Sequence, residues 1–411
     1  MTKQERSWIL YDWANSAYSI AITTAILPLY FKDVIAASLP GALSTAYWGY
    51  ANAFATLVIS LSAPFLGTMA DYRGYKKRLF TLFMLLGTLF TASLYFIQPG
   101  QWQLCVLLYI LSAIGFAGAN IFYDSFLTDI TETKNMDWIS SLGFGFGYIG
   151  SCIPFIISLV LIMNPDAIGT SALQATRLSF LITASWWFIF SLPMMKNVQQ
   201  NYFIEPEPRP LRNSFKRLSK TIKNIRGHKN IFMFLIAYFF YIDGVDTIIK
   251  MATVYGSDVG LKSSDMLLIL LVSQFIAFPF AILFGKLAKK FSARSMISFA
   301  ILLYTFICFY AYFMNSVIHF WVLTILVMTS QGGIQALSRS FFGKMLPKEH
   351  SNEFFGFYNI FGKFAAIMGP LLVGVFSQVT GNSRFGILSL VLLFATGFIL
   401  FRRVPIPLDE N

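Results

Sequence analysis

The sequence predicts an all-α membrane protein with twelve transmembrane helices, and three observations support this fold class. Only 12% of the 411 residues are charged and 56% are hydrophobic, whereas a soluble domain carries about 25% charged residues. The hydrophobic residues gather in runs that reach the length of about 20 residues needed to cross a bilayer. The basic residues lie mainly between these runs, where charge determines the orientation of membrane helices.

Each predicted helix is an apolar run that ends at a polar or turn-forming segment. The first run follows Met1–Arg6 without a small-residue cleavage site, so we interpret it as a membrane helix rather than a removable signal peptide. Several runs are longer than the bilayer requires, and we expect these helices to tilt or their ends to project. In chain order the spans cover residues 7–31, 42–70, 78–97, 102–130, 137–163, 175–195, 229–255, 264–288, 294–314, 317–345, 352–379 and 384–402.

The distribution of lysine and arginine predicts the orientation of the helices. With the N-terminus in the cytoplasm, most of the 31 basic residues fall in cytoplasmic segments. Only Lys32, Arg177, Lys262 and Arg384 fall in outer segments, and the positive-inside rule describes this asymmetry. The even number of spans agrees with both termini lying in the cytoplasm. We expect an integral, multi-pass protein of the bacterial cytoplasmic (inner) membrane.

Composition and motifs argue against several other classes. The net charge of +12 does not indicate nucleic-acid binding, because the basic residues lie in short loops. The three cysteines lack disulfide or metal spacing, and no nucleophile motif or phosphate loop is present, so we expect no enzyme activity, cofactor or metal. Gly145–Gly150 matches a dinucleotide fingerprint, but it lies inside a span without a preceding strand. We predict instead that Gly143 and Gly147 form a small-residue contact between helices.

The longest connection divides the spans six and six. It defines three predicted units, residues 1–195, 196–229 and 230–411. The proline-rich segment Glu205–Pro210 is incompatible with a helix. A basic amphipathic helix follows, which suits the anionic cytoplasmic leaflet of a bilayer, although a plain tether and a regulatory site both fit this composition. Its apolar stripe consists of Leu211, Phe215, Leu218, Ile222 and Ile225.

The two sets of six spans resemble each other weakly. The segment GANIFYDSF, which starts at Gly118 in span four, aligns with GIQALSRSF, which starts at Gly333 in span ten. Gly67 at the end of span two aligns with Gly285 at the end of span eight. Two six-helix repeats joined by a central loop resemble the layout of the major facilitator superfamily. In that fold the substrate binds between the halves near the middle of the membrane.

The segment GTMADYRGYKKR, Gly67–Arg78, follows span two. It resembles the superfamily signature at the cytoplasmic turn between helices two and three. Glycines at positions 67 and 74 allow a close helix approach and a tight turn, and Asp71 can meet the positive N-terminal end of span eleven near Ser351. In the superfamily this motif latches the outward-open state. The resemblance therefore implies a gating role for Gly67, Asp71, Gly74, Lys76, Lys77 and Arg78.

An ordinary basic turn is the alternative to this latch, in which the lysines and arginine only hold the turn inside. The second half departs from the signature, because Lys289 replaces the aspartate and the following segment lacks the glycine. We therefore expect no matching second latch.

Two longer strings suggest a specific branch of the superfamily. YDWANSAY at Tyr11–Tyr18, DGVDTI at Asp243–Ile248 and the span-four segment around Asn120 resemble the bacterial relatives of the fungal vacuolar amino-acid effluxers, the autophagy-related permease family. The resemblance covers essentially the whole chain and implies a secondary transporter. Because the fungal members are associated with moving amino acids out of the vacuole, amino acids are the first expected cargo.

Span seven carries three ionisable residues. Isolated at the bilayer centre, Asp243, Asp246 and Lys250 would cost about 7–10 kcal/mol together, which the apolar residues of the span only partly offset. We therefore expect them to face the bundle interior, a water-filled cavity or one another. Asp246 and Lys250 are four residues apart and can pair. Counting along spans seven and eleven from their inner ends places Asp243 and Lys363 at comparable depth, so we predict a bridge between them.

A second group of ionisable residues lies nearer the cytoplasm, namely Asp12, Asp124 and Arg339. Because Asp124 and Arg339 are repeat equivalents of opposite sign, they could close an inner gate or bind the two charged ends of a zwitterion. A buried carboxylate can also carry a proton during transport, with a static ion pair as the alternative. A polar stripe on span one suits a wet cavity. Its members are Asp12, Ser16, Ser19 and Thr23, with Asn15 beside them.

The leading prediction is a secondary transporter of small organic solutes, amino acids first, that works by alternating access with a proton or another coupling ion. Export of lipids or amphipathic drugs on the same fold is an alternative, and a non-transporting membrane receptor or scaffold is another class. A lipid carrier should show a lateral apolar opening, and an amino-acid carrier a closed polar pocket. The predicted substrate or proton sites are Asp12, Asn15, Ser16, Asn120, Asp124, Asp243, Asp246, Arg339 and Lys363.

Overall fold

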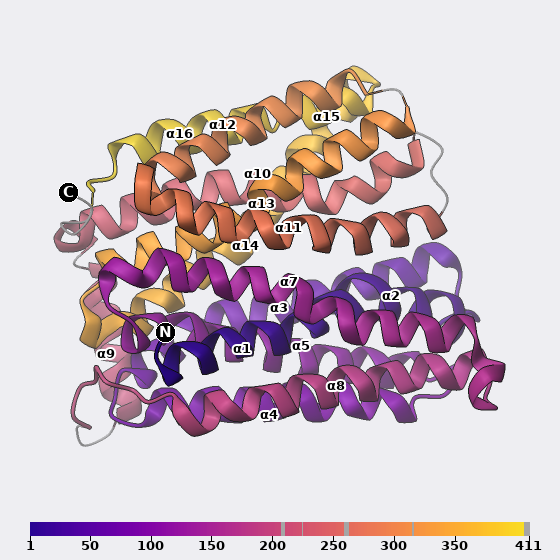
Figure 1. The fold of residues 1–411 in the computed structure, drawn as a ribbon, viewed down its shortest axis with the longest axis horizontal. Helices are drawn as coiled ribbons and strands as arrows, with labels where there is room; N and C mark the ends of the chain where they lie inside the picture. The colour runs from indigo at the N-terminus through magenta and orange to yellow at the C-terminus, as the bar shows by residue number, and fades with distance from the viewer. Residues whose placement is uncertain (207–209, 224, 259–262, 315, 407–411) are drawn as a thin grey trace.

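The computed structural model describes residues 1–206, 210–223, 225–258, 263–314 and 316–406. Long helices lie side by side and form one elongated bundle (Figure 1). Both chain termini lie at the same end of this bundle, which we call the terminal face (Figure 1). Within the described residues, twelve helical segments are long and apolar enough to cross a membrane. The prediction of an all-α, twelve-span membrane protein is confirmed.

Two sets of six spans precede and follow the linker, and we call them the first half and the second half. The first half consists of α1 (Lys3–Tyr18), a π-helix (Ser19–Ala25), α2 (Ile26–Tyr30), a second π-helix (Phe31–Ile35), α3 (Gly41–Ala70), α4 (Tyr75–Ser93), α5 (Trp102–Ser125), α6 (Leu127–Ile130), α7 (Met136–Met163) and α8 (Ala172–Asn197). The linker holds α9 (Pro210–Lys223). The second half consists of α10 (Lys229–Asp258), α11 (Ser263–Phe291), α12 (Ala293–Tyr312), α13 (Val317–Met345), α14 (Ser351–Thr380), α15 (Ser383–Leu388) and α16 (Val391–Arg403).

Each half packs around its own apolar core. The core of the first half includes the buried rings of Trp8 and Phe122, and that of the second half includes Phe234 and Tyr304. Other large apolar side chains point outward, such as Leu61, which is 68% exposed. An apolar outer surface is expected where side chains face lipid tails instead of water.

The turns after α3 and after α11 each place a residue with positive φ directly before the next helix. Gly74 has φ 77° and ψ −7°, and Ser292 has φ 68° and ψ 150°. These residues occupy the same position relative to Gly67 and Gly285, the glycines aligned between the halves. The two turns thus share a positive φ at this position but differ in ψ, and the second half lacks the glycine that a positive φ favours.

The linker forms the predicted amphipathic helix. α9 packs against α3, and Phe215 stacks on Phe65 with ring centroids 4.2 Å apart. Leu218, from the same apolar stripe, packs against the core of the second half. Three further members of the predicted stripe, the side chains of Leu211, Ile222 and Ile225, lie outside the described residues, as do residues 207–209 of the proline-rich segment.

Candidate substrate cavity and gate

A cavity of about 420 Å³ lies between the two halves. A smaller cavity of about 190 Å³ adjoins it around Lys363. Helices α1, α5 and α7 line the larger cavity on one side, and α10, α11, α13 and α14 line it on the other. Its polar lining includes Asp12, Asn15, Ser16, Ser19, Thr24, Asn120, Asp124, Tyr148, Gln274, Gln331, Gln335, Arg339, Asn359 and Lys363.

Most of the predicted substrate-site residues meet at this cavity, although the sequence places them on five different spans. Asp246 lines the smaller cavity, and Asp243 lines neither cavity. The predicted residues at the larger cavity are Asp12, Asn15, Ser16, Asn120, Asp124, Arg339 and Lys363.

Span one presents its polar stripe to the cavity with a shift in register. The first three members of the stripe line the cavity as expected, but the next polar residue there is Thr24 instead of Thr23. Residues Ser19–Ala25 form a π-helix, in which hydrogen bonds span five residues instead of four. The Thr24 hydroxyl donates to the Ser19 carbonyl at 2.9 Å. The wider turn thus moves the stripe on by one position.

Glycines on α7 allow span one to approach closely. A Cβ atom at Gly143 would meet the Asp12 carboxylate, and one at Gly147 would meet the Ser16 hydroxyl. The predicted small-residue contact at Gly143 and Gly147 is confirmed, and it sets the position of two cavity-lining side chains.

Arg339 forms the end of the cavity nearest the terminal face. Its guanidinium donates to Asp124 Oδ1 at 3.0 Å and to Asp12 Oδ2 at 3.4 Å. It also donates to the hydroxyl of Ser140 at 3.0 Å and to its carbonyl at 3.2 Å. These contacts engage all three guanidinium nitrogens, so Arg339 has little capacity left for a substrate. The predicted approach of Asp124 and Arg339 is present, and it connects the two halves.

A second connection between the halves lies closer to the terminal face. Asp137 accepts hydrogen bonds from Ser340 and from Lys344, each at 2.6 Å. Sequence reasoning missed this pair, because Lys344 lies at a span end and was assigned only to orientation. The available signal was that Asp137 and Lys344 each lie about one helical turn nearer to the ends of their spans than Ser140 and Arg339.

The signature turn contacts the start of α14 as predicted. Asp71 Oδ1 accepts hydrogen bonds from the backbone N–H of Asn352 at 3.1 Å and from its side-chain amide at 3.0 Å. A Cβ atom at Gly67 would collide with the Asn352 backbone, so the glycine permits the approach. The aspartate therefore accepts from the N-terminal end of a helix, where the helix dipole favours a negative charge.

Lys76 differs from the expectation that it holds the turn inside as a basic residue. Its side chain is fully buried and its ammonium lies 2.5 Å from Asp129 Oδ2, with the Phe126 ring 5.0 Å away. Asp129 also accepts the backbone N–H groups of Asn201 and Tyr202. Asp129 therefore ties the linker to α6, and Lys76 of α4 neutralises its charge. Arg78, in contrast, is exposed.

A residue that the sequence did not single out joins the contacts between the signature turn and α14. Arg217 of α9 donates to Asp71 Oδ2 at 2.7 Å and to Glu353 Oε2 at 3.2 Å, and its guanidinium lies 3.2 Å from His350 Nδ1. Burial raises the pKa of Asp71 to about 7, while the positive charge of Arg217 lowers it. Arg217 was read only as part of a basic helix, and its place on the inward face beside Leu218 was the available signal.

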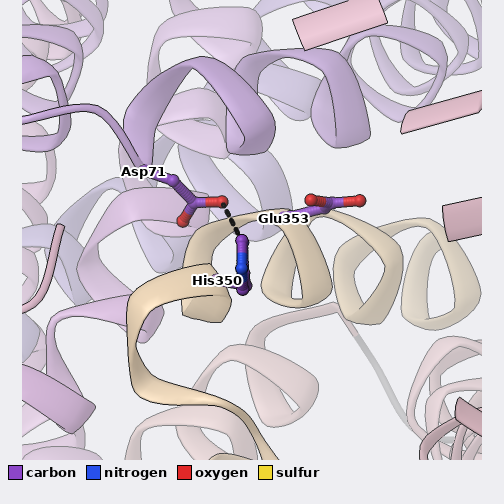
Figure 2. Close-up of side chains that lie close together, drawn as sticks. All are labelled: Asp71, His350 and Glu353. Carbon is purple, nitrogen blue, oxygen red and sulfur yellow. Dashed lines mark ion pairs between the residues drawn. The ribbon is translucent and has the colours of Figure 1, made fainter. Parts of the chain in front are cut away.

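Figure 2 shows how Asp71, His350 and Glu353 converge from α3 and from the start of α14. Their ligand-type atoms lie within 4.8 Å of one another, as in clusters that can bind a metal ion. Arg217 already brings a positive charge to all three groups, so we assign the cluster to an ion-pair network. Among the described residues, the hydrogen bonds and ion pairs that join the halves lie in the region from Arg339 and its partners to the terminal face.

A family model described as "Vacuole effluxer Atg22 like" matches residues 42–408. The chain belongs to this family. It is 54% identical over 407 residues, 98% of this chain and 95% of the relative, to the uncharacterized MFS-type transporter YxiO of Bacillus subtilis. It is 23% identical to autophagy-related protein 22 of Saccharomyces cerevisiae, over 92% of this chain and 87% of that protein.

Solved structures show the same fold. The proton:xylose symporter XylE, solved with a bromodeoxyglucose, superposes with a TM-score of 0.73 at 11% identity and covers 98% of this chain and 96% of its own. The transporter FucP in the outward conformation has a TM-score of 0.71 at 16% identity, with 98% of both chains covered. The Atg22-like chain is thus a multi-pass membrane protein with the major facilitator fold, and the family resemblance is confirmed.

The predicted bridge between Asp243 and Lys363 is wrong for this Atg22-like structure. Asp243 Oδ1 accepts the backbone N–H of Gly369 at 2.9 Å and the Thr247 hydroxyl at 3.4 Å. Gly369 lies six residues beyond Lys363 on α14, about 9 Å along the helix. The depth comparison assumed that the two helices start at the same level, but α10 and α14 are staggered. Asp243 Oδ2 is buried and has no hydrogen-bond partner among the described residues.

Asp246 is the carboxylate of α10 that faces the cavity of the Atg22-like protein. It lines the smaller cavity together with Lys363, and the positive charges of Lys250 and Lys363 act on its carboxylate. Lys363 therefore belongs with Asp246 instead of Asp243, and the pairing of Asp246 with Lys250 stays a prediction.

Carboxamide side chains in the second half were missed by sequence reasoning. Gln331, Gln335 and Arg339 recur at four-residue intervals on α13 and line the cavity together with Gln274 and Asn359. The spacing of the two glutamines from Arg339 marks one face of a helix and was the signal that could have identified them.

Proposed function

We propose that this secondary transporter carries small zwitterionic solutes, amino acids first, through the central cavity. The observation that carries the proposal is the coexistence of separated charges of both signs in one small polar cavity. Its volume of about 420 Å³ falls in the range of small-molecule sites, about 300–1,000 Å³. Such a cavity fits a solute that carries a carboxylate and an ammonium group a few bonds apart.

The charged groups divide the two ends of such a solute between them. Arg339 is already engaged by first-half groups, so among the described residues that line the cavity Lys363 is the cation proposed to bind a carboxylate. Asp12 and Asp124 retain side-chain exposures of 12% and 16% and can accept the ammonium group. Carboxamides on α11, α13 and α14 supply both donors and acceptors to orient the solute.

The alternatives fit the cavity less well. A carrier of lipids or amphipathic drugs gains little from buried charges, whereas the described lining carries charges and carboxamides from both halves. A scaffold or receptor gains nothing from these buried charges, which are costly inside a membrane. We therefore propose transport of the solute rather than its chemical conversion, and no catalytic role for these residues.

Alternating access gives the inter-half contacts a function. We propose that the terminal face is the cytoplasmic side of a bacterial cytoplasmic membrane, that the basic face of α9 lies against its anionic leaflet, and that the contacts around Arg339 and Asp71 close this side. For net export, they would have to break while the opposite ends of the halves approach. Protonation of Asp12 or Asp124 would remove a charge that holds Arg339, which offers a route to proton coupling.

Counterflow in proteoliposomes tests the cargo. Proteoliposomes that contain the purified protein are loaded with one unlabelled amino acid at a time. Uptake of the same amino acid in labelled form is then followed with and without a pH gradient. Exchange of at least one amino acid is expected, with a variant Lys363→Gln as the comparison. The cargo assignment is wrong if no amino acid exchanges while a fluorescent lipid or an amphipathic dye is moved.

A further inference from the structure

The linker helix α9 contacts both halves of the molecule at once. Phe215 stacks on Phe65 of α3, whereas Leu218 packs against the core of the second half. Arg217 lies between these contacts and hydrogen-bonds to Asp71 of the first half and Glu353 of the second. A helix in this position cannot keep all its contacts when the halves separate at the terminal face.

Arg217 also brings a positive charge to two buried carboxylates, one from each half. Asp71 is fully buried and Glu353 is 2% exposed, and Glu353 Oε1 has no hydrogen-bond partner within the described residues. Withdrawal of Arg217 while the halves stay together would leave two buried negative charges side by side. Arg217 and the closed arrangement therefore depend on each other.

The outer face of α9 has the opposite character. Basic side chains recur along it at four- and three-residue intervals, and they line a shallow groove with Phe215 and Ser219. Residues 210–223 contain no aspartate or glutamate. Like charges at this spacing repel one another on a helix surface, so anions supplied from outside would stabilise the helix. The basic residues of the groove are Arg212, Lys216, Lys220 and Lys223.

We propose that the outer face of α9 binds the headgroups of anionic phospholipids, and that this binding holds Arg217 between Asp71 and Glu353 and keeps the terminal face closed. The inference rests on the proposed alternating access but not on the identity of the cargo. A phospholipid is the occupant that fits, because the exposed Phe215 ring, 60% exposed, offers an apolar contact beside the basic groups.

The test measures closure directly and needs no cargo. Spin labels at Glu132→Cys in the first half and Lys290→Cys in the second, both exposed positions, report the separation of the halves at the terminal face by double electron–electron resonance. The three native cysteines are buried and are replaced by serine or alanine in this background. The labelled protein is placed in nanodiscs of phosphatidylcholine alone or with phosphatidylglycerol.

Phosphatidylglycerol is expected to increase the short-distance population several-fold over phosphatidylcholine. The variant Lys216→Gln/Lys220→Gln/Lys223→Gln should lose this response, whereas the control Arg402→Gln/Arg403→Gln, at exposed basic residues of the same face, should keep it. Arg217→Ala should shift to long distances in both lipids, and Arg217→Lys should recover part of the closed population. Size-exclusion profiles identify any variant that fails to fold.

Three outcomes would overturn the proposal. The first is a distance distribution that does not depend on the lipid. The second is a full lipid response in the triple variant or a closed Arg217→Ala protein. The third is closure in pure phosphatidylcholine on addition of inorganic phosphate, which would assign the groove to a soluble anion. Failure of the amino-acid counterflow test would leave these distances unaffected, so the two proposals fail separately.

Discussion

At the residue scale, the proposed function predicts that substrate binding depends most on the side chain of Lys363. Replacement by glutamine removes the cation proposed to hold the carboxylate, and a hydrogen bond to a charged group contributes about 1.5–3 kcal/mol. We expect Lys363→Gln to raise the KM for exchange by about tenfold or more. The exposed Lys290→Gln at the terminal end of α11 is the control, and equal KM values for both variants would contradict the assignment.

The partner of Lys363 can be determined by a double-mutant cycle. Asp246→Asn and Lys363→Gln should be non-additive in their effect on KM, with a coupling of about 0.5–3 kcal/mol. Asp243→Asn and Lys363→Gln should add to within about 0.5 kcal/mol, because Asp243 contacts Gly369 instead. The reverse pattern would restore the bridge that the sequence predicted.

Gly369 provides a prediction about stability. A Cβ atom there would collide with Thr247 and Asp243, and overpacking of this kind costs about 1–3 kcal/mol. Gly369→Ala should therefore lower the thermal midpoint in detergent. Gly374→Ala is the matched control on the same helix, because a Cβ atom at Gly374 meets nothing within 4 Å; the close contact is refuted if both variants unfold at the same temperature.

At the element scale, the two turns with a positive φ should respond in opposite ways to substitution. Ser292 has φ 68° and ψ 150°, a region that essentially only glycine occupies and that costs other residues about 1–3 kcal/mol. Ser292→Gly should raise the thermal midpoint, although its helix-capping hydroxyl is lost at a cost of a few tenths of a kcal/mol. Gly74→Ala should lower the midpoint, because Gly74 has φ 77°, and a midpoint that rises would contradict the left-handed conformation at this position.

The elements themselves were largely predictable from the sequence. Runs of apolar residues identify membrane helices because the hydrocarbon core leaves few other solutions, and the predicted spans agree with the observed helices to within a few residues at most ends. The π-helix in span one was not predictable, because its sequence, Ser19–Ala25, is compatible with an ordinary α-helix. The one-residue shift from Thr23 to Thr24 followed from that missed turn.

The site was only partly predictable, for a different reason. Ionisable residues inside spans are conspicuous, so Asp12, Asp124 and Arg339 could be identified, and the repeat related Asp124 to Arg339. Pairing across non-equivalent helices depends on their relative stagger, which no single sequence encodes locally, and the assignment of Asp243 failed for this reason. Arg217 was missed because its position beside Leu218 places it near the apolar stripe of α9 but does not say which carboxylates lie opposite.

At the scale of the whole molecule, closure of the terminal face should depend on pH. In the closed arrangement the pKa of Asp71 is about 7, whereas an exposed aspartate has a pKa of about 3.9. The closed form therefore binds a proton on the Asp71 carboxylate more tightly than a form in which Asp71 is exposed. Low pH thus favours closure. As the pH rises from about 4 to 7, ionisation should favour the open form by up to about 1.4 kcal/mol per pH unit, and the effect should level off above 7.

The spin-label distances described above measure this pH dependence. The charged or titratable groups around Asp71 are Arg217, His350, Glu353 and Lys76, so the control must remove Asp71 alone. Asp71→Asn is expected to flatten the profile between pH 4 and 7. A steep profile that survives this substitution would assign the titration to a neighbour.

The position of Arg217 also gives the covalent connection between the halves a role of its own. In a chain with two repeated halves, a linker normally needs only to be long enough to connect them. Here it carries a side chain that both halves use, so separate polypeptides for residues 1–195 and 230–411 could assemble and still lack part of their closure. Any gene fusion or fission in this lineage would therefore have altered the balance between the two conformations together with the chain's continuity.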